Sequence, residues 1–498
     1  MSIDVRVPAS ATYSKIVATI GPATCNPVAL KALEKAGMSV ARLNGSHADL
    51  DWHRAAITLI REVLPQVPIL LDIPGRKIRT VALAHEPSFS EGDTIVLTTD
   101  LSYDGHQKVP VNYADLHKDV KPGSTIMADD GTLSFHVADV RGQDLICIAR
   151  TAGTLRSRKG INVPFVQLNT ALVTERDRLM TGFARELGVD FIGISFVESA
   201  AHVEAIRELV GARTPQILAK VENQGGVDHL EEIVAAADAI MIDRGDLSVE
   251  TRLETLALYQ KKIIEAARAE GKPVIVATEM LHSMIRSNQP TKAEVADITN
   301  AVLDGCSATM LSGETAIGDY PLEAVGVMRR VADTAFGHLN SRSAEQSGPW
   351  AANPARAMEE AIAMILRSAS VTKVVAITRS GYAARRLSAR GVSQPILAVG
   401  DNPSLARAFN LYAGVQGVHF RTEVPRGSAD YIKACIQFLF EAGKLSVEDE
   451  ILVTGAIYPR SGTRMNLIEL HKVANLVTEF GWRHSGDAES ETSTLALA

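Results

Sequence analysis

The stretch ILAKVENQGG, residues 217–226, brings an ammonium and a carboxylate to the end of an apolar run. The run itself has the continuous apolar pattern of a strand that is buried on both faces of a parallel sheet. Lys220 and Glu222 are spaced by two, so an extended chain turns both toward the same side. Because buried charges cost free energy unless they are paired, this stretch predicts a strand that ends at a functional site.

Eight short runs of this kind, each followed by a turn and a helical pattern, lie between residues 15 and 312. They are KIVATI (15–20), SVARL (39–43), PILLD (68–72), DFIGIS (190–195), QILAKV (216–221), AIMID (239–243), PVIVAT (273–278) and ATMLS (308–312). Eight alternating strand and helix units predict a (β/α)8 TIM barrel, an α/β fold whose active site lies at the C-terminal strand ends.

The alternation of strand and helix patterns is interrupted once, after the third run, and it ends after the eighth run. More than 100 residues separate the third run from the fourth, too many for a loop in a compact barrel. Their short strand patterns predict an inserted β-barrel lid domain at residues 81–163, leaving 1–80 and 164–342 for the catalytic barrel. A Ser- and Pro-containing linker at 340–354 precedes a predicted C-terminal α/β domain at 345–482, and residues 483–498 are predicted to be a disordered tail.

Composition narrows the class of protein. The chain has 498 residues, 46% hydrophobic and 22% charged, as in a globular protein of several domains. It contains no apolar run of membrane-spanning length, and its N-terminus lacks the apolar core of a secretory signal, so we expect a cytoplasmic protein. A net charge of −7 with scattered basic residues predicts no nucleic-acid and no membrane partner. Four widely separated cysteines favour a reducing compartment.

Basic, acidic and hydroxyl side chains lie at the C-terminal ends of most of the predicted strands. They include Arg42, Ser46, Asp72, Ser195, Lys220, Glu222, Asp243, Arg244, Asp246, Thr278 and Glu279, with the amide of Asn44 and the backbone of Gly245 beside them, and Arg79 follows the third strand. Glu222 and Asp246 supply the oxygen ligands that Mg2+ or Mn2+ prefers. Arg42 and Lys220 would then meet phosphoryl oxygens. Taken singly, each residue is as well explained by a solvated turn or a barrel-mouth ion pair, but their convergence on strand ends favours a phosphoryl-transfer site.

Eight segments of the chain, taken in order, resemble segments of the pyruvate kinase family. The motifs are SKIVATIGPAT, MSVARLNGSH, RKGINVP, AKVENQGGV, DRGDLS, KPVIVATEML, PTKAEVADITNAVLDG and MLSGETAIGDYPLEAV, and the resemblance covers nearly the whole chain. It implies transfer of the phosphoryl group of phosphoenolpyruvate to ADP, protonation of the enolate to pyruvate, and a homotetramer.

The resemblance also implies roles for individual residues. Lys220 would stabilise the moving phosphoryl group, Arg42 would bind the substrate phosphate, and Thr278 would belong to the proton-delivery path. Glu222 and Asp246 would hold the divalent metal, and Asp246 would also adjoin the substrate, with Ser195 and the Gly245 backbone. Arg79, Asn44 and, from the lid, Lys159 would face the nucleotide, and Asp130 would act at the lid's edge.

Residues 72–79, DIPGRKIR, depart from the family's usual Asp-Thr-Lys-Gly-Pro-Glu-Ile-Arg at Pro74, Arg76 and Lys77. Family members with Glu at the position of Lys77 tend to need K+, held near the residues that match Asn44, Ser46 and Asp72. Members with Lys there tend not to need it. A fixed ammonium can supply the charge of the monovalent cation, so we expect turnover that does not require K+.

Three further departures leave more than one function open. Asp243 replaces a small residue, Glu279 a Gln and Gly45 an aromatic residue. Asp243 would repel a substrate carboxylate unless Arg76, Lys77 or Arg244 neutralises it, so it marks either a compensated charge swap or a different enol phosphate or 2-oxo acid as substrate. The same residues are also compatible with a metal-dependent pyruvate-enolate lyase or a catalytically weak paralogue. TRSGYAARRLSAR (378–390) resembles the family's effector loop, although Tyr382 suits a purely structural loop as well.

Overall fold

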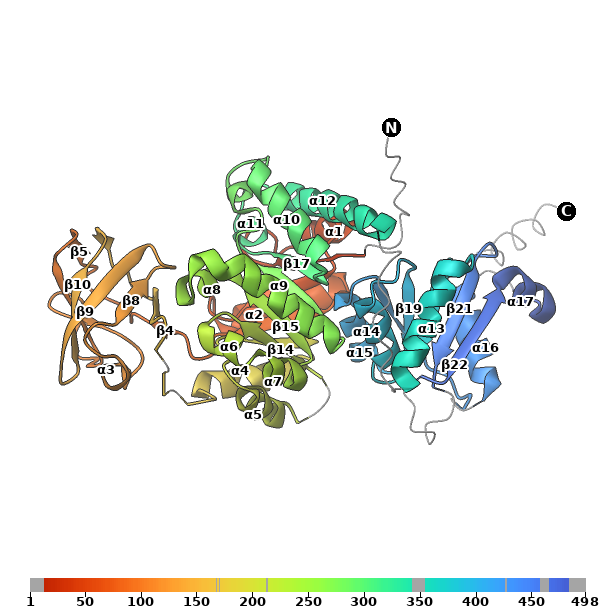
Figure 1. Cartoon of the computed structure of the whole chain (residues 1–498), viewed down its shortest axis with the longest axis horizontal. Helices are drawn as coiled ribbons and strands as arrows, with labels where there is room; N and C mark the ends of the chain where they lie inside the picture. The colour runs from red at the N-terminus through yellow and green to blue at the C-terminus, as the bar shows by residue number, and fades with distance from the viewer. Residues whose placement is uncertain are drawn as a thin grey trace.

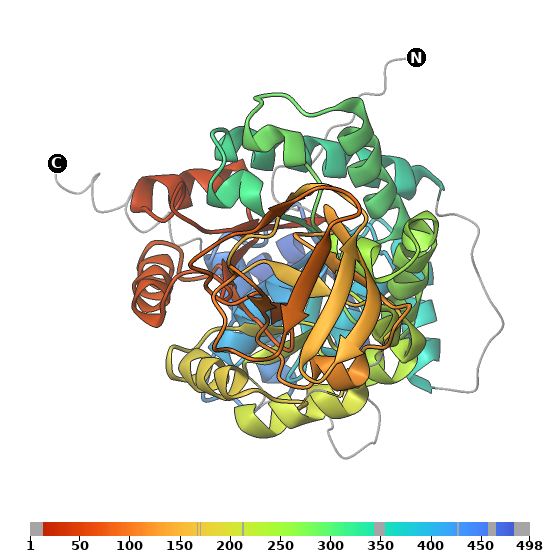
Figure 2. The ribbon, with the colours of Figure 1, turned by 90° about the vertical axis from the view of Figure 1, so that its left-hand side faces the viewer.

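The computed structural model describes residues 13–342 and 354–482, except residues 167, 170, 212–213, 426–427 and 457–464. Three parts lie in a row: the inserted lid, the barrel and the C-terminal domain (Figure 1). In a view from the lid side, the barrel helices form a ring behind the lid (Figure 2). Among the described residues, no helix has the length and apolar character needed to cross a membrane.

The predicted barrel is confirmed. Eight parallel strands close in the order β1-β17-β16-β15-β14-β13-β3-β2, and each lies within about one residue of its predicted run. They are β1 (Lys15–Thr19), β2 (Val40–Asn44), β3 (Ile69–Ile73), β13 (Phe191–Ile194), β14 (Gln216–Val221), β15 (Ala239–Asp243), β16 (Val274–Ala277) and β17 (Ala308–Leu311).

Helices cover the outside of the barrel and are bounded by local signals. The Asp49 side chain caps α2 by accepting from Trp52 N, and Thr291 with Glu294 forms a capping box at the start of α10. The outer helices are α1 (Pro27–Ala36), α2 (Leu50–Val63), α4 (Glu175–Glu186), α5 (Ala200–Val210), α7 (Leu230–Ala236), α9 (Leu256–Ala269), α10 (Lys292–Asp304) and α12 (Pro321–Arg342). Short helices at strand ends are α6 (Gln224–Asp228), α8 (Arg244–Glu250) and α11 (Gly313–Ala316).

The C-terminal domain closes the N-terminal end of the barrel. Ala408 and Leu411 belong to the same buried apolar cluster as the inward-facing Val17, Leu70 and Met241. Lys15 at the start of β1 donates to the carbonyl of Val415 across this boundary, at 2.8 Å. The C-terminal strand ends, on the opposite side, therefore remain available for a site.

The lid is built mainly from short strands. Seven of them form a sheet in the order β4-β12-β8-β9-β10-β6-β7, and a bridge between Thr80 and Val111 joins the chain beside its two edge strands. The strands are β4 (Ile78–Arg79), β6 (Thr94–Thr98), β7 (Val109–Pro110), β8 (Thr125–Ala128), β9 (Leu133–Arg141), β10 (Asp144–Ala149) and β12 (Gly160–Asn162), with β5 (Ser88–Phe89) and β11 (Gly153–Thr154) paired separately. A short helix, α3 (Leu116–Asp119), interrupts the all-β pattern, and β4 places two residues before 81 in the lid sheet.

The C-terminal domain has a five-stranded sheet in the order β20-β19-β18-β21-β22, with β22 antiparallel. Its elements are α13 (Pro354–Ser368), β18 (Lys373–Ile377), α14 (Tyr382–Ala389), β19 (Ile396–Gly400), α15 (Pro403–Ala408), β20 (Val415–His419), α16 (Ala429–Glu441), β21 (Glu450–Gly455), β22 (Leu467–Lys472) and α17 (Val473–Phe480). The predicted linker is shorter than 340–354, since α12 ends at Arg342 and α13 begins at Pro354. Residues 343–353 and the predicted tail at 483–498 lie outside the described residues.

Candidate active site

Strand alternation places the polar groups above the apolar interior of the barrel. Leu218 of β14 and Met241 of β15 belong to that interior, so Lys220 and Asp243, two residues further along each strand, also face inward. Lys220 is level with Met241 in the strand register, and the chains continue in parallel to Glu222 and Asp243. The site therefore begins where the apolar layers end.

Lys220 lies at the centre of this polar layer. Its ammonium is 3.1 Å from Glu222 Oε2, 3.0 Å from Asp243 Oδ2 and 3.3 Å from the Ser195 hydroxyl, to which it donates. Ser195 in turn donates to the carbonyl of Ile73 at 3.0 Å. Burial lowers the pKa of Lys220, but Glu222, Asp243 and Asp72 outweigh it and hold the pKa above its usual range. Lys220 is therefore a buried, charged ammonium.

Arg42 is fixed in the same layer by β3 and β1. Its guanidinium donates to Asp72 Oδ2 through Nε at 2.8 Å, with Nη2 2.7 Å from the same oxygen, and through Nη1 to the Thr19 hydroxyl at 3.0 Å. Asp72 fits because Gly193 of the neighbouring strand has no side chain: a Cβ there would lie 1.9 Å from Asp72 Oδ1. Arg42 is thus held in one orientation at the barrel mouth.

Helix α8 brings the second acidic group and a backbone donor. Both oxygens of Asp246 accept from the Lys77 ammonium, at 2.6 and 2.8 Å. The Gly245 N–H donates to the Thr278 hydroxyl at 2.8 Å. Thr278 itself has a φ of 67°, a conformation that costs a non-glycine residue free energy and is concentrated at functional sites.

Three carboxylates converge between these groups. One oxygen from each of Glu222, Asp243 and Asp246 lies within 4.8 Å of the others. Phe196 N donates to Glu222 Oε1 at 2.8 Å, whereas the buried Oε2 makes the ionic contact with Lys220 but no hydrogen bond. Burial raises the pKa of Glu222, and Lys220 offsets this only in part. This hard-oxygen donor set, with an unsatisfied buried oxygen, fits Mg2+ or Mn2+.

Asp243 has an ion-pair partner, Lys220, that the sequence analysis did not name. Arg76, Lys77 and Arg244 pair instead with Glu198 at 2.9 Å, Asp246 at 2.6 Å and Asp297 at 2.7 Å. The ion pair of Asp243 is with Lys220. Burial tends to raise the pKa of Asp243, but Lys220, Lys77 and Arg42 outweigh it, and the pKa is lowered. The spacing of two from Ala239 and Met241 was the signal that Asp243 faces inward with the metal pair.

The residues matched to a monovalent-cation site lie side by side, but Lys77 points elsewhere. Asn44 is level with Asp72 in the register of β2 and β3, and its Oδ1 accepts from Ser46 N at 3.2 Å. Asp72 pairs with Arg42, whereas Lys77 pairs with Asp246. The Lys77 ammonium is therefore in the active site, on its acidic side.

Of the residues assigned to the nucleotide, Asn44 ends strand β2 of the barrel, whereas Arg79 and Lys159 lie on the lid and its connection to the barrel. Arg79 Nη1 donates to the carbonyl of Arg158 at 3.2 Å, and Lys159 pairs with Asp129 at 2.7 Å. Asp130 is exposed beside Asp129, and both have positive φ angles, 54° and 52°. These side chains face lid groups and have not been drawn into the cluster around Lys220.

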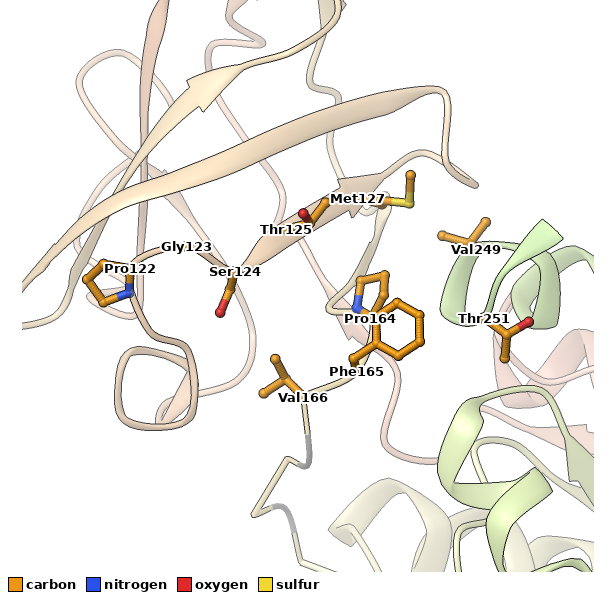
Figure 3. A pocket seen from close by; sticks show the side chains of 10 residues that line it. All are labelled: Pro122, Gly123, Ser124, Thr125, Met127, Pro164, Phe165, Val166, Val249 and Thr251. Atoms are coloured by element: carbon orange, nitrogen blue, oxygen red, sulfur yellow. The ribbon is translucent and has the colours of Figure 1, made fainter. Parts of the chain in front are cut away.

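A cleft separates the lid from the end of α8. The Asn162 amide of β12 donates to Glu250 of α8 at 2.7 Å, so the two parts are joined beside the cleft. Burial raises the pKa of Glu250 to about 7. The cleft has a volume of about 640 Å3, with Met127 and Phe165 on the lid side and Val249 and Thr251 on the barrel side (Figure 3). Its barrel side, at Val249, is one turn of α8 away from Asp246.

The loop at 378–390 is tied into the C-terminal domain. The Thr378 hydroxyl accepts from Gly381 N at 2.9 Å. Tyr382 and Arg386 both contact the buried Glu359, at 3.4 and 2.8 Å. These contacts favour the structural interpretation of the loop.

Comparisons with known proteins agree with this arrangement. Residues 11–325 match the family model described as pyruvate kinase, barrel domain, and residues 356–471 match pyruvate kinase, alpha/beta domain. The chain belongs to the pyruvate kinase family. A pyruvate kinase of Bacillus licheniformis is 37% identical over 480 residues, covering 94% of this chain and 81% of that protein. The pyruvate kinase of Clostridium perfringens is 35% identical over 92% of this chain and 99% of its own, and that of Mycobacterium intracellulare 36% over 92% and 98%.

Membership of the pyruvate kinase family confirms the family resemblance, the fold class and the prediction of a phosphotransferase. The roles of individual residues, the metal and the nucleotide contacts stay predictions. The structure brings Arg42, Ser195, Lys220, Glu222, Gly245, Asp246 and Thr278 to one end of the barrel.

Proposed function

We propose that this enzyme transfers the phosphoryl group of phosphoenolpyruvate to ADP and protonates the resulting enolate, giving pyruvate and ATP. The observation that carries the proposal is the buried Lys220 ammonium, held among Ser195, Glu222 and Asp243 with its charge intact. Phosphoryl transfer depends on cations placed around the oxygens of the moving group rather than on covalent catalysis.

Arg42 suits the phosphate of the enol substrate. Its planar guanidinium is held by Asp72 and Thr19, and a fixed guanidinium matches the geometry of phosphate oxygens. Glu222 and Asp246 would hold the divalent ion, which supplies positive charge to substrate oxygens when bound. In the transfer, the bond between phosphorus and the enol oxygen breaks, and a bond to an oxygen of the ADP β-phosphate forms.

Thr278 is placed for the proton step. Its hydroxyl donates to the Ala277 carbonyl at 2.6 Å and accepts from Gly245 N at 2.8 Å. After loss of the phosphoryl group, the enolate takes a proton at its terminal carbon, and we assign Thr278 to the path of that proton. Arg79, Asn44 and Lys159 would face the ADP phosphates once the substrates are bound. A cytoplasmic location and a homotetramer stay predictions.

The test is ADP-dependent formation of pyruvate from phosphoenolpyruvate by the purified full chain with Mg2+. Turnover supports the proposal, and its absence contradicts it. A panel of other enol phosphates should be run in parallel, because Asp243 lies beside Gly245, with its Oδ1 3.6 Å from the position of a Cβ on that residue. Turnover of one of these substrates alone would establish the second candidate, a paralogue with a changed substrate. Pyruvate and inorganic phosphate formed without ADP would indicate transfer of the phosphoryl group to water, which is hydrolysis, and would contradict the proposal.

We also propose that turnover does not require K+. The support is a fixed ammonium in the active site: Lys77 is half-buried against Asp246 rather than beside Asn44 and Asp72, and its pKa is raised because Asp246 outweighs the effect of burial. We predict that omission of K+ changes the rate of the wild type by less than about twofold, whereas Lys77→Glu loses at least about tenfold without K+ and recovers when K+ is added. Rates are compared in K+ and in a tetraalkylammonium salt at equal ionic strength. Equal responses of wild type and variant would contradict the proposal.

A further inference from the structure

Asp243 stands where the family has a small residue, at the end of β15 and 7% exposed. We propose that Asp243 is a third protein ligand of the divalent metal ion, beside Glu222 and Asp246. The inference rests on the proposed function for the presence of that ion. It assigns to Asp243 a contact that the family pattern, with two acidic ligands, does not contain.

The three carboxylates lie close enough to share one ion. One oxygen from each of the three carboxylates lies within 4.8 Å of the other two. Opposite ligands of an octahedral Mg2+ are about 4.2 Å apart, at about 2.1 Å from the ion, and adjacent ligands are closer. Small rotations of side chains therefore suffice to bring all three oxygens onto one ion.

The Glu222 carboxylate indicates a cation independently of Asp243. Glu222 is fully buried, and Phe196 N holds its Oε1 at 2.8 Å. Its Oε2 lies 3.1 Å from the Lys220 ammonium and accepts no hydrogen bond. Because this ionic contact leaves the buried oxygen without a hydrogen bond, a metal ion bound there would supply a direct ligand bond.

The net charge of the cluster also favours a divalent cation. Three carboxylates and the two ammonium groups of Lys77 and Lys220 sum to one negative charge, whereas the same cluster without Asp243 would carry none. A divalent cation is therefore attracted more strongly with Asp243 present. Its binding would also compete with Lys220 for Glu222 and Asp243 and so release the ammonium toward the phosphoryl group.

Asp243 has a consequence for the substrate as well. Mg2+ accepts about six ligands, so a third protein ligand leaves one position fewer for substrate oxygens and water. We therefore expect this enzyme to bind the metal before the substrate with higher affinity than a two-carboxylate site. We also expect phosphoenolpyruvate to enhance metal binding less in the wild type than in Asp243→Ala.

The experiment is titration of the full chain with Mn2+, without substrate, following free Mn2+ by electron paramagnetic resonance. We expect Asp243→Asn and Asp243→Ala to bind Mn2+ at least about tenfold more weakly than wild type, because each removes a charged ligand. Asp243→Glu, which retains the charge, should lose less. Glu250→Gln is the matched control: this carboxylate is one helical turn from Asp246 but bonded to Asn162, and its Mn2+ affinity should stay within about twofold.

Mn2+ affinities of Asp243→Asn and Asp243→Ala within about twofold of wild type, or tighter, would overturn the inference and make Asp243 the counter-ion of Lys220 alone. Weak binding in Glu222→Gln would show in that case that the proposed metal site itself still stands. A wild type that binds no Mn2+, even with phosphoenolpyruvate, would overturn both. If the Asp243 variants do not fold, a manganese-soaked crystal of the wild type decides, since an Asp243 oxygen within about 2.5 Å of the ion is required.

Discussion

Lys220 is held by acceptors from its own strand and from both neighbouring strands. Glu222 follows it on β14, Ser195 comes from the end of β13 and Asp243 from β15. Such a buried arrangement is stabilising only as a set, because removal of one partner leaves the others with uncompensated charge. The same set keeps the ammonium charged at the point where phosphoryl oxygens are proposed to arrive.

We predict that Lys220→Met lowers pyruvate formation at least about 100-fold, since a preorganised cation at developing charge is lost. Exchange of the methyl protons of bound pyruvate with solvent should remain detectable, because Thr278 contacts Gly245 and Ala277 rather than Lys220. Coupled assay of pyruvate and proton NMR in D2O measure the two steps separately. Loss of both steps in a variant that still unfolds cooperatively would contradict this division of roles, as would retention of full kinase activity.

At the scale of single elements, β13 owes part of its function to a missing side chain. Gly193 is level with Asp72 in the register of β13 and β3. The space above it holds the Asp72 carboxylate, which in turn orients Arg42. Strand positions usually favour β-branched residues. Glycine is required at this one because a side chain would collide with Asp72 of the neighbouring strand.

We predict that Gly193→Ala displaces Asp72 from Arg42, because the added Cβ would lie 1.9 Å from Asp72 Oδ1. The KM for phosphoenolpyruvate should rise at least about tenfold, with a loss of about 1–3 kcal/mol in stability from overpacking. Gly182→Ala in α4 is the matched control, since nothing lies within 4 Å of its added Cβ and alanine favours a helix. Unchanged KM in Gly193→Ala would show that Asp72 does not position Arg42 for substrate.

Some parts of the molecule could be predicted from the sequence in detail, and others could not. The barrel strands were predictable because each is an uninterrupted apolar run, and strand alternation placed Lys220 and Glu222 together. The pairings of β20 and β22 were not, since their sequences, such as LIELHK of β22, lack a continuous apolar run. The contacts of Lys77 with Asp246 and of Arg76 with Glu198 were also missed, because they depend on the path of the connection between barrel and lid.

The boundary between the barrel and the C-terminal domain contains a buried lysine that does not belong to the active site. Lys15 is 7% exposed and donates to the carbonyl of Val415, while Arg329 lies nearby and donates to the carbonyl of Ser14. Burial, and then Arg329, lower the pKa of Lys15 from 10.5 to about 7. Between these two pH values the unfolded chain binds more protons than the folded one, so stability rises with pH across that interval.

We therefore predict that the thermal midpoint of the wild type rises between pH 7 and pH 9 relative to that of Lys15→Met, by the equivalent of about 2 kcal/mol. The sign follows from the lowered pKa: folding must expel a proton from Lys15 above pH 7, and this cost disappears as the unfolded chain also loses its proton near pH 10.5. Lys31→Met, at an exposed position of α1, is the control and should keep the wild-type pH dependence. Differential scanning calorimetry at matched ionic strength measures all three proteins. Parallel pH dependences in the wild type and Lys15→Met would mean that Lys15 remains protonated at the boundary, with its charge compensated by carbonyls there.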